Sequence, residues 1–486
     1  MKNASLDLSD SLDYLPKTSE NKDQSNSALI SNISLAIIII FFSVSILASF
    51  SKFGPILNYG VPVVSTLIAI YLYFRTPTLY ISFMFWCWIL IPLIRRISDY
   101  YSVFTNPSPM LLTPYLVSLV SIITLLRYIP QSRNYKGLPF VIAFLGICYG
   151  ILVGFINRKP YIVLRESMDW IIPISLGYHF VINWKLYPQY RQIIQKTFIW
   201  AVFLMGIYGI VQFLAIPDWD RLWVIESDMI SAAGSPDESG GTRVWSTMQS
   251  GEPFSAFMAA ALLVLMTSKS YFSLPASIPG YISFLLTLVR SGWLGWLGGF
   301  LLLASSLKVK FQLRLILLFG VLLLFILPVA TSDVFGDKIV KRIDTLANVQ
   351  DDSSAAGRQE VFQESIGGAL LNVSGDGIGG GTRDNIILAV LFDLGWIGSV
   401  PYIGALSFLM HQVFTQKRSS DDLFIPTCQA VVVTTLVRLP VNGSLMGLSG
   451  ILLWGFLGLV IAADHHQKYS IEQSLFYEIK NLNLDS

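Results

Sequence analysis

Runs of apolar residues, separated by shorter polar breaks, recur along most of the 486-residue chain. A helix that crosses the hydrocarbon core of a bilayer needs roughly 20 mostly apolar residues, because no water is present there to pair with backbone groups. About 14 runs meet this requirement. They are centred near residues 42, 65, 85, 117, 147, 176, 206, 260, 281, 299, 321, 399, 431 and 453. The pattern predicts an all-α fold, a polytopic transmembrane helix bundle of about 12–14 spans.

Two polar stretches are too long to be turns between neighbouring membrane helices: residues 217–252 and 331–385. Loops of this length inside a compact bundle are usually functional or disordered, so we expect the chemistry of the protein there rather than in its helices. The remaining segments are a polar tail (1–28), an N-terminal group of membrane helices (29–216), a second group (253–330), a C-terminal group (386–463) and a second polar tail (464–486).

The distribution of lysine and arginine predicts the orientation of the bundle. Basic residues in short loops accumulate on the cytoplasmic side of a membrane, whereas long loops do not follow this rule. When the two long loops are set aside, most basic residues fall on the side of the two termini. We therefore expect both tails in the cytoplasm and both long loops outside. The first apolar run follows a polar stretch of mixed charge, so a cleaved signal peptide is not expected.

Composition narrows the class of protein. Hydrophobic residues make up 53% of the chain and charged residues 13%, with a mean hydropathy of +0.60, which a water-soluble domain cannot accommodate. The net charge is only +2, and no basic cluster is interleaved with aromatic residues, which gives no support to nucleic-acid binding. Cys87, Cys148 and Cys428 lie in separate apolar runs, so a disulfide framework or a zinc site is not indicated. We also expect no bound metal and no cofactor.

The first long loop is rich in aromatic and charged residues. It follows a helix that ends in Tyr208-Gly209-Ile210-Val211-Gln212-Phe213, and it begins with Pro217-Asp218-Trp219-Asp220-Arg221-Leu222-Trp223. Its aromatic residues are typical of the belt at a membrane interface. The loop returns through Arg243, just before the next membrane helix. Arg243 is therefore either a charge that simply flanks the membrane helix or a residue that binds an anion.

A very short turn places a second arginine at the edge of the membrane. The turn reads Leu288-Val289-Arg290-Ser291-Gly292-Trp293. An arginine in or beside the bilayer is costly unless it is paired, so Arg290 is a candidate site residue, with snorkelling to the interface as the alternative. Gly292, Gly295 and Gly298 recur every three residues and predict that this helix packs closely on another.

The second long loop contains Arg358, followed by an amphipathic stretch, and then a glycine-rich segment. The segment reads Gly375-Asp376-Gly377-Ile378-Gly379-Gly380-Gly381-Thr382-Arg383-Asp384-Asn385. It satisfies G-x-G-x-x-G, but no predicted strand precedes it, which argues against a dinucleotide site. Backbone N–H groups of Gly375, Gly377 and Gly379, followed by Arg383 and a helix N-terminus, could instead cradle phosphate groups. Capping of that helix is the alternative role of Asp384 or Asn385.

Taken in order, these features resemble the bacterial O-antigen ligase and polymerase superfamily of membrane glycosyltransferases. The resemblance runs from Tyr208 to Trp454. It rests on the Tyr208-Gly209 to Gln212 motif with its Asp/Trp tail, the Arg243 segment before a helix, Arg290-Ser291-Gly292 at a hairpin, Arg358 before an amphipathic stretch, and Gly375-Asp376-Gly377 leading to Asp384-Asn385 and Asp393-Leu394-Gly395. The order of the matches carries the resemblance rather than any single one.

The resemblance implies metal-independent transfer of a glycan from a polyprenyl diphosphate donor to a glycan or glycolipid acceptor. It places that reaction at the outer face of the bacterial cytoplasmic (inner) membrane, beside membrane lipid and other polysaccharide assembly proteins. It implies that arginines bind the diphosphate, and the matching positions are Arg243, Arg290, Arg358 and Arg383. The family's proposed base is a histidine just before Asn in the last motif. Here that position is Asp384, which we expect to be the catalytic base.

The missing histidine also bears on the type of transfer. That histidine is typical of transfer to lipid A core, so its absence favours a polymerase over a ligase. A flippase for lipid-linked oligosaccharides would match the span number, but it would need charged residues along the bundle interior and has no use for a long outer loop. A small-solute transporter would show related halves and broken helices. An inactive scaffold for polysaccharide assembly is the remaining alternative.

Overall fold

The computed structural model describes residues 17–132, 136–229, 233–234, 242–309, 312–313, 320, 324, 353–380, 385–415, 422–439 and 445–482. It describes the side chains of these residues except at 17–28, 353–358 and 476–482. Throughout this part the regular structure is helical, and the β-type pairing found in it is an isolated bridge between Gly234 and Thr242. The predicted all-α class is confirmed.

The helices follow the predicted apolar runs. Those of the N-terminal half are α1 (Lys17–Ser49), α2 (Gly54–Arg75), α3 (Pro77–Tyr101), α4 (Thr113–Leu119), α5 (Ile122–Tyr128), α6 (Leu138–Asn157), α7 (Pro160–Ile182), α8 (Tyr187–Leu214) and α9 (Asp218–Glu226). Those of the C-terminal half are α11 (Gly251–Thr267), α12 (Ser273–Leu286), α13 (Arg290–Ser306), α16 (Ser353–Leu371), α17 (Ile386–Thr415), α18 (Phe424–Val437) and α19 (Gly447–Leu482). Proline opens α3 and α7, where its missing N–H group would have had no helical partner.

Eight helical segments of the described chain are long and apolar enough to cross a membrane. They are Leu29–Ser49, Gly54–Arg75, Pro77–Tyr101, Pro109–Gln131, Leu138–Asn157, Trp184–Leu214, Ile386–Thr415 and Gly447–Leu475. Three apolar helices are shorter: α11, α12 and α18. Every predicted span centre falls in a helix except that near 321, which lies outside the described residues. The protein is multi-pass, while the total of about 12–14 spans stays a prediction.

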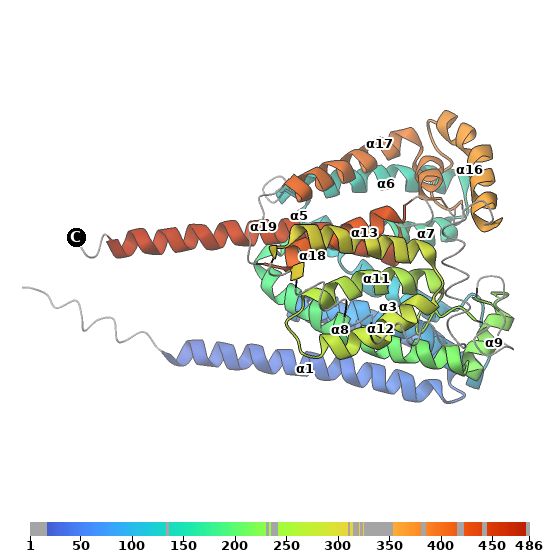
Figure 1. The fold of residues 1–486 in the computed structure, drawn as a ribbon, viewed down its shortest axis with the longest axis horizontal. Helices are drawn as coiled ribbons and strands as arrows, with labels where there is room; N and C mark the ends of the chain where they lie inside the picture. The colour runs from blue at the N-terminus through green and yellow to red at the C-terminus, as the bar shows by residue number, and fades with distance from the viewer. Residues whose placement is uncertain are drawn as a thin grey trace, which may run out of the picture.

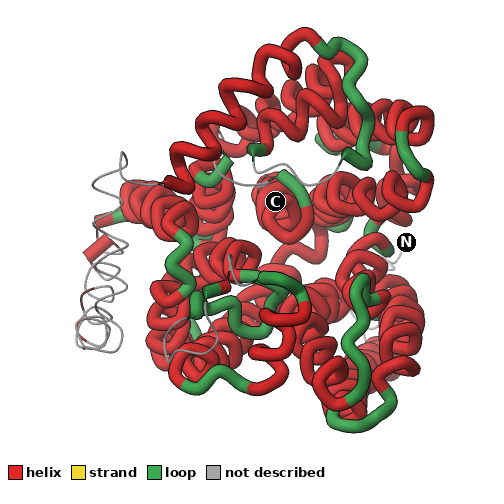
Figure 2. The backbone as a smooth tube through the Cα atoms, turned by 90° about the vertical axis from the view of Figure 1, so that its right-hand side faces the viewer, coloured by secondary structure: helices red, strands yellow, loops and turns green. Residues whose placement is uncertain are grey.

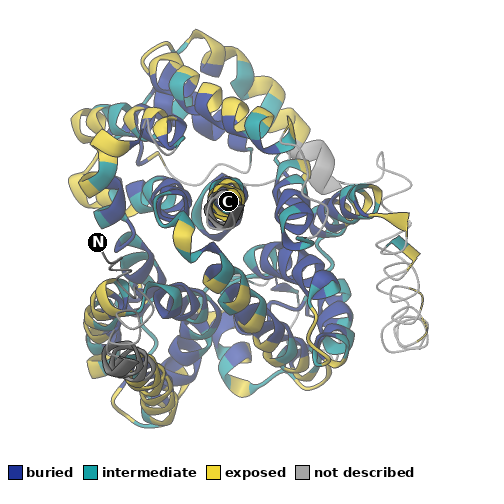
Figure 3. Ribbon diagram, turned by 90° about the vertical axis from the view of Figure 1, so that its left-hand side faces the viewer, coloured by how far each residue is buried: buried dark blue, intermediate teal, exposed yellow. Residues whose placement is uncertain are grey.

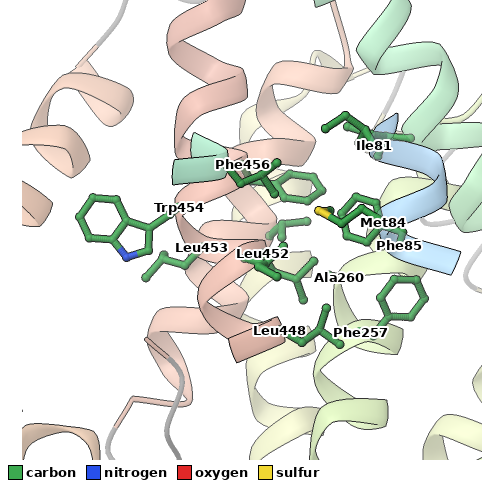
Figure 4. Packing of buried hydrophobic residues seen from close by; sticks show 14 of the residues in the cluster. Ile81, Met84, Phe85, Phe257, Ala260, Leu448, Leu452, Leu453, Trp454 and Phe456 are labelled. Carbon is green, nitrogen blue, oxygen red and sulfur yellow. The ribbon is translucent and has the colours of Figure 1, made fainter. Parts of the chain in front are cut away.

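The last long helix, α19, forms the centre of the bundle. Nearly all of its apolar stretch is buried, whereas most of α1 is exposed at the edge (Figures 1 and 3). Viewed from one end, the other helices surround α19 (Figure 2). It packs mainly on α7 and α18. Figure 4 shows Leu452 and Phe456 of α19 beside Met84 and Phe85 of α3 and Phe257 of α11, which make up part of the core.

Glycines allow several helix pairs to approach closely. A Cβ atom added at Gly206 of α8 would lie 2.7 Å from the backbone nitrogen of Gly280 in α12. One added at Gly398 of α17 would lie 2.7 Å from the carbonyl oxygen of Gly146 in α6. Inside a bilayer, helices associate through close packing rather than through the hydrophobic effect, so small residues at the crossings favour assembly.

Both predicted long loops lie at the same end of the bundle. Figure 1 shows α9, from the first loop, and α16, from the second, at the right-hand end, opposite the outer ends of α1 and α19. We call this the loop end. The relative placement agrees with the predicted topology, and which end faces the cytoplasm stays a prediction. Both predicted polar tails are partly helical, since α1 begins at Lys17 and α19 continues to Leu482.

Candidate functional site

A buried ion pair anchors the first long loop to the bundle. An Nη atom of Arg96 in α3 lies 2.8 Å from the carboxylate of Asp220 in α9, and both side chains are 0% exposed. The other Nη of Arg96 donates to the carbonyl oxygen of Ser246 at 2.6 Å. The pair therefore joins two stretches of the loop, α9 and residues 242–250, to a membrane helix.

Gln212, near the end of α8, completes this anchor. Its Nε2 donates to Asp220 at 2.6 Å. Its Oε1 accepts the N–H groups of Trp245 at 3.0 Å and Ser246 at 2.8 Å. We call Arg96, Gln212, Asp220 and Ser246 the loop clamp. The clamp fixes the backbone of the segment that carries the predicted diphosphate-binding residue of this loop.

Two tryptophans of the loop pack around the clamp. Trp223 and Trp245 are buried, and the Cζ atom of Arg96 lies 5.9 Å from the ring centroid of each. The hydroxyl group of Tyr208 donates to Asp220 at 2.9 Å. The interpretation of the loop's aromatic residues as an interfacial belt is wrong for Trp223, because a small core inside the loop buries this side chain.

Two of the predicted diphosphate-binding residues lie close together. The N–H group of Arg243 donates to Ala233 at 2.7 Å, and that of Val244 donates to the carbonyl oxygen of Leu286 at 3.0 Å, which sets this segment against the turn before α13. Arg290 is the first residue of α13. Burial, and then the positive charge of Arg290, lower the pKa of Arg243 from its usual value. The structure thus brings together two guanidinium groups from distant parts of the sequence.

A third arginine, which sequence reasoning missed, lies in the same region. Arg438 follows the last residue of α18, and its guanidinium group pairs with the carboxylate of Glu252 in the first turn of α11. The side chain of Arg438 is 1% exposed and that of Glu252 is 41% exposed. Arg438 could have been predicted in the same way as Arg290, because both are charged residues at the end of an apolar run.

Glycines bring these charged groups to one place. A Cβ atom added at Gly251 would lie 3.7 Å from Cγ2 of Val289, and one at Gly295 would lie 2.9 Å from Cγ of Arg438. Gly292 packs directly against α11. The first turn of α11, the N-terminus of α13 and the end of α18 therefore meet. The close packing predicted for the glycines of α13 is confirmed, with α11 and α18 as the partners.

We call Arg243, Arg290, Arg438 and Glu252 the arginine cluster. These four residues carry three positive charges and one negative charge. An arginine binds carboxylate or phosphate oxygens through two parallel hydrogen bonds, which gives both strength and orientation. The cluster is therefore suited to an anion with several oxygens, such as a diphosphate.

The glycine-rich segment of the second loop is held between α6 and α17. The N–H group of Asp376 donates to the carbonyl oxygen of Phe392 in α17 at 2.6 Å, and that of Ile378 donates to Gly150 in α6 at 3.0 Å. Opposite the segment, Gly395 interrupts α17 with φ 58° and ψ −174°. Backbone hydrogen bonds therefore tie the segment to one helix on each side.

Gly375, Gly377 and Gly379 make this packing possible. Their φ angles of 74°, 82° and 116° lie where only glycine fits without strain. A Cβ atom at Gly375 would lie 2.5 Å from the nitrogen of Gly395, and one at Gly377 would overlap the backbone of α6. The N–H group of Gly375 donates to Oδ1 of Asn372 at 2.9 Å, so the predicted phosphate cradle cannot use it. Close packing accounts for these glycines.

The remaining predicted site residues lie partly or wholly outside the described structure. Arg383 and Asp384 are outside the described residues. Arg358 lies in α16, but its side chain is outside the described part. Oδ1 of Asn385 accepts the N–H group of Ile387 at 2.9 Å, so the helix-capping interpretation is confirmed for Asn385.

The fold and the arginine cluster define the class of this protein. Within the described residues, no group of three or more His, Cys, Asp and Glu side chains could hold a metal ion. No family model matches the chain, and no curated protein matches it. The protein is an all-α, multi-pass membrane protein. At its loop end Arg243 lies near Arg290, and Arg438 pairs with Glu252.

Proposed function

We propose that the chain is a glycosyltransferase of the bacterial cytoplasmic membrane, which takes a glycan from a polyprenyl diphosphate and joins it to a surface polysaccharide, either O-antigen or exopolysaccharide. The observation that carries the proposal is the approach of Arg243 and Arg290 at the loop end. The order of motifs from Tyr208 to Trp454 supports it, because that order resembles the O-antigen ligases and polymerases.

Two positive charges that lie close together repel each other, and an anion bound between them lowers that repulsion. Burial and the charge of Arg290 both lower the pKa of Arg243, so the site destabilises the charged form of this side chain. A bound diphosphate would favour the charged form of Arg243. The leaving diphosphate also gains negative charge as its bond to the sugar breaks, and positive groups already in place stabilise the transition state more than the ground state.

The proposed reaction is a direct displacement at the anomeric carbon. The bond from that carbon to the diphosphate oxygen breaks, and its electron pair leaves with the diphosphate. The acceptor hydroxyl oxygen forms the new bond and loses its proton to Asp384, the proposed base. Arg358 and Arg383 would contribute further charge from the second loop. This scheme uses side chains alone for charge stabilisation and proton transfer.

Polymerisation is the form of transfer that we favour. The position that carries histidine in the related ligases is Asp384 here, and all four histidines of the chain, at 179, 411, 465 and 466, lie outside both long loops. The partners of a polymerase are the lipid-linked oligosaccharide donor and a second glycan, with membrane lipid around the bundle and other assembly proteins beside it.

A deletion strain complemented with variants tests this proposal. Loss of chain length with one repeat still attached would indicate a polymerase, and loss of all attachment a ligase. Arg243→Ala and Arg290→Ala should fail to restore the polysaccharide at matched protein levels. Arg221→Ala removes an exposed arginine of α9 at the same end and should restore it. Normal chain lengths with both cluster variants would show that the proposal is wrong.

A further inference from the structure

The pairing of Arg438 with Glu252 points to an anion site that the protein's own carboxylate occupies. We propose that Glu252 is an internal counter-ion, which holds Arg438 until the diphosphate of the donor displaces it. Arg438 then becomes the third guanidinium ligand of that diphosphate. The inference rests on the proposed function, because it adds a residue and a control element to the same site.

Arg438 is buried too deeply to remain without an anion. Its side chain is 1% exposed, and a Cβ atom at Gly295 of α13 would lie 2.9 Å from its Cγ and 3.0 Å from its Cδ. A guanidinium group removed from water is costly unless an opposite charge neutralises it. Some carboxylate or phosphate must therefore lie beside Arg438 in each functional state.

Glu252 is placed as a partner that can leave. Its side chain is 41% exposed, and it lies in the first turn of α11, where the helix dipole stabilises a carboxylate. Solvent and the helix end would both stabilise this carboxylate after it leaves Arg438. Its contact with Arg438 runs through one Nη atom, and Nε of Arg438 has no hydrogen bond within the described residues. That edge of the guanidinium group suits two phosphate oxygens.

The position of the pair indicates a diphosphate as the occupant. Gly251, next to Glu252, lies against Val289, which precedes Arg290. Arg438 contacts α13 at Gly295, five residues or about 7.5 Å along the helix axis from Arg290. The first long loop, α13 and α18 thus supply one arginine each. Three arginines match the charge of a diphosphate better than that of a single phosphate, and they fit two linked phosphate groups.

Binding of inorganic pyrophosphate to the full chain in phosphatidylcholine nanodiscs tests the inference. Glu252→Gln removes the competing charge and should bind pyrophosphate about tenfold more tightly than the wild type. Glu226→Gln, an exposed site of α9 at the same end, loses one negative charge as well and should bind like the wild type. The double variant Glu252→Gln/Arg438→Gln should lose the gain. Equal affinity of Glu252→Gln and the wild type would overturn the inference.

Two further measurements of pyrophosphate binding complete the test. If Glu252→Gln does not fold because buried Arg438 is left without an anion, the double variant lacks both charges and avoids that cost. The wild type must then bind pyrophosphate more tightly than the double variant, and equal affinity of those two would overturn the inference. Nanodiscs of phosphatidylglycerol then offer a headgroup whose single phosphate gives it a net negative charge, whereas phosphatidylcholine is zwitterionic. Tighter pyrophosphate binding by Glu252→Gln should persist there, whereas its loss would identify the lipid headgroup as the occupant and reject the diphosphate.

Failure of the proposed function would look different. Tighter pyrophosphate binding by Glu252→Gln, together with normal polysaccharide from Arg290→Ala in the deletion strain, would support the displaceable counter-ion and reject the glycosyltransferase. Unchanged binding by Glu252→Gln, together with loss of polysaccharide in Arg290→Ala, would reject the counter-ion and leave the proposed function supported.

Discussion

Replacing Asp220 with asparagine should loosen the first long loop. One carboxylate oxygen of Asp220 faces Arg96 at 2.8 Å, and the other accepts hydrogen bonds from Gln212 at 2.6 Å and Tyr208 at 2.9 Å. An asparagine offers one oxygen and one NH₂ group, so in either orientation its NH₂ group faces a donor. Gln212 cannot rotate its amide to compensate, because its Oε1 already accepts two backbone N–H groups.

The magnitude follows from the burial of the pair. Arg96 and Asp220 are both 0% exposed, so solvent cannot replace the lost charge. Removing one partner of a buried ion pair typically costs about 3–5 kcal/mol, because the other charge is left uncompensated. Tyr208→Phe removes one hydrogen bond to the carboxylate, which should cost about 1.5–3 kcal/mol. It also removes the acceptor of Nε1 of Trp219, a half-buried side chain that solvent can reach. We therefore expect Asp220→Asn to lower the free energy of unfolding more than Tyr208→Phe does.

Thermal unfolding in detergent, followed with a thiol-reactive dye, measures this ranking. Cys87 and Cys428 are free and buried, so the dye reaches them only when the bundle opens. Asp220→Asn should have the lowest midpoint and Tyr208→Phe an intermediate one. Asp228→Asn changes an exposed carboxylate just after α9 and should unfold like the wild type. If Asp220→Asn and Asp228→Asn unfold at the same temperature, the clamp does not stabilise the protein and our reasoning is refuted.

Four further predictions address topology, chemistry and packing. Cysteine introduced at Ser353 should react with an impermeant maleimide in cells stripped of their outer barrier, and labelling of the C-terminal tail instead would reverse the orientation. Arg290→Lys keeps the positive charge but loses the planar guanidinium group that makes two parallel hydrogen bonds, so the rate of glycan transfer should fall. Removal of a preorganised donor typically lowers the rate roughly 10²- to 10³-fold, and an unchanged rate would indicate a side chain that only snorkels to the interface. Asp384→Asn retains size and capping ability, so activity should fall without a change in unfolding temperature, and normal polysaccharide would exclude it as the base. Gly377→Ala places a Cβ atom against α6 at a residue with positive φ, so it should lower the free energy of unfolding by at least about 1–2 kcal/mol. The Cβ atom of Gly367→Ala, in α16, meets open space, and equal unfolding temperatures of these two variants would contradict the packing role of Gly377.

The helices themselves were predictable from the chain. Lipid cannot pair with backbone groups, so a run of roughly 20 apolar residues has to form a helix whatever its neighbours are. The same local reasoning singled out Arg290, because a charge at the end of such a run is visible without a structure. It also predicted close packing at Gly292, Gly295 and Gly298, since small residues repeated on one helix face leave room for another helix.

The glycine-rich segment has a packing role that the sequence alone does not reveal. Gly375, Gly377 and Gly379, followed by Arg383 and a helix N-terminus, predict a phosphate cradle. A glycine is required wherever φ is positive or another backbone approaches, and the sequence does not say which of these applies. Here α6 and α17 approach from both sides, and a crossing of helices more than 200 residues apart is a property of the folded chain.

The sequence determined which segments are apolar enough to enter the membrane, and it singled out Arg290 at the end of one of them, because both depend on how each residue interacts with lipid and water. Only the tertiary structure decided that Arg438 pairs with Glu252 and that Arg96 pairs with Asp220. The apolar residues of a membrane helix do not specify which helix it packs on, because many neighbouring helices could bury them equally well. Charged groups far apart in sequence therefore meet only after every helix has found its neighbours.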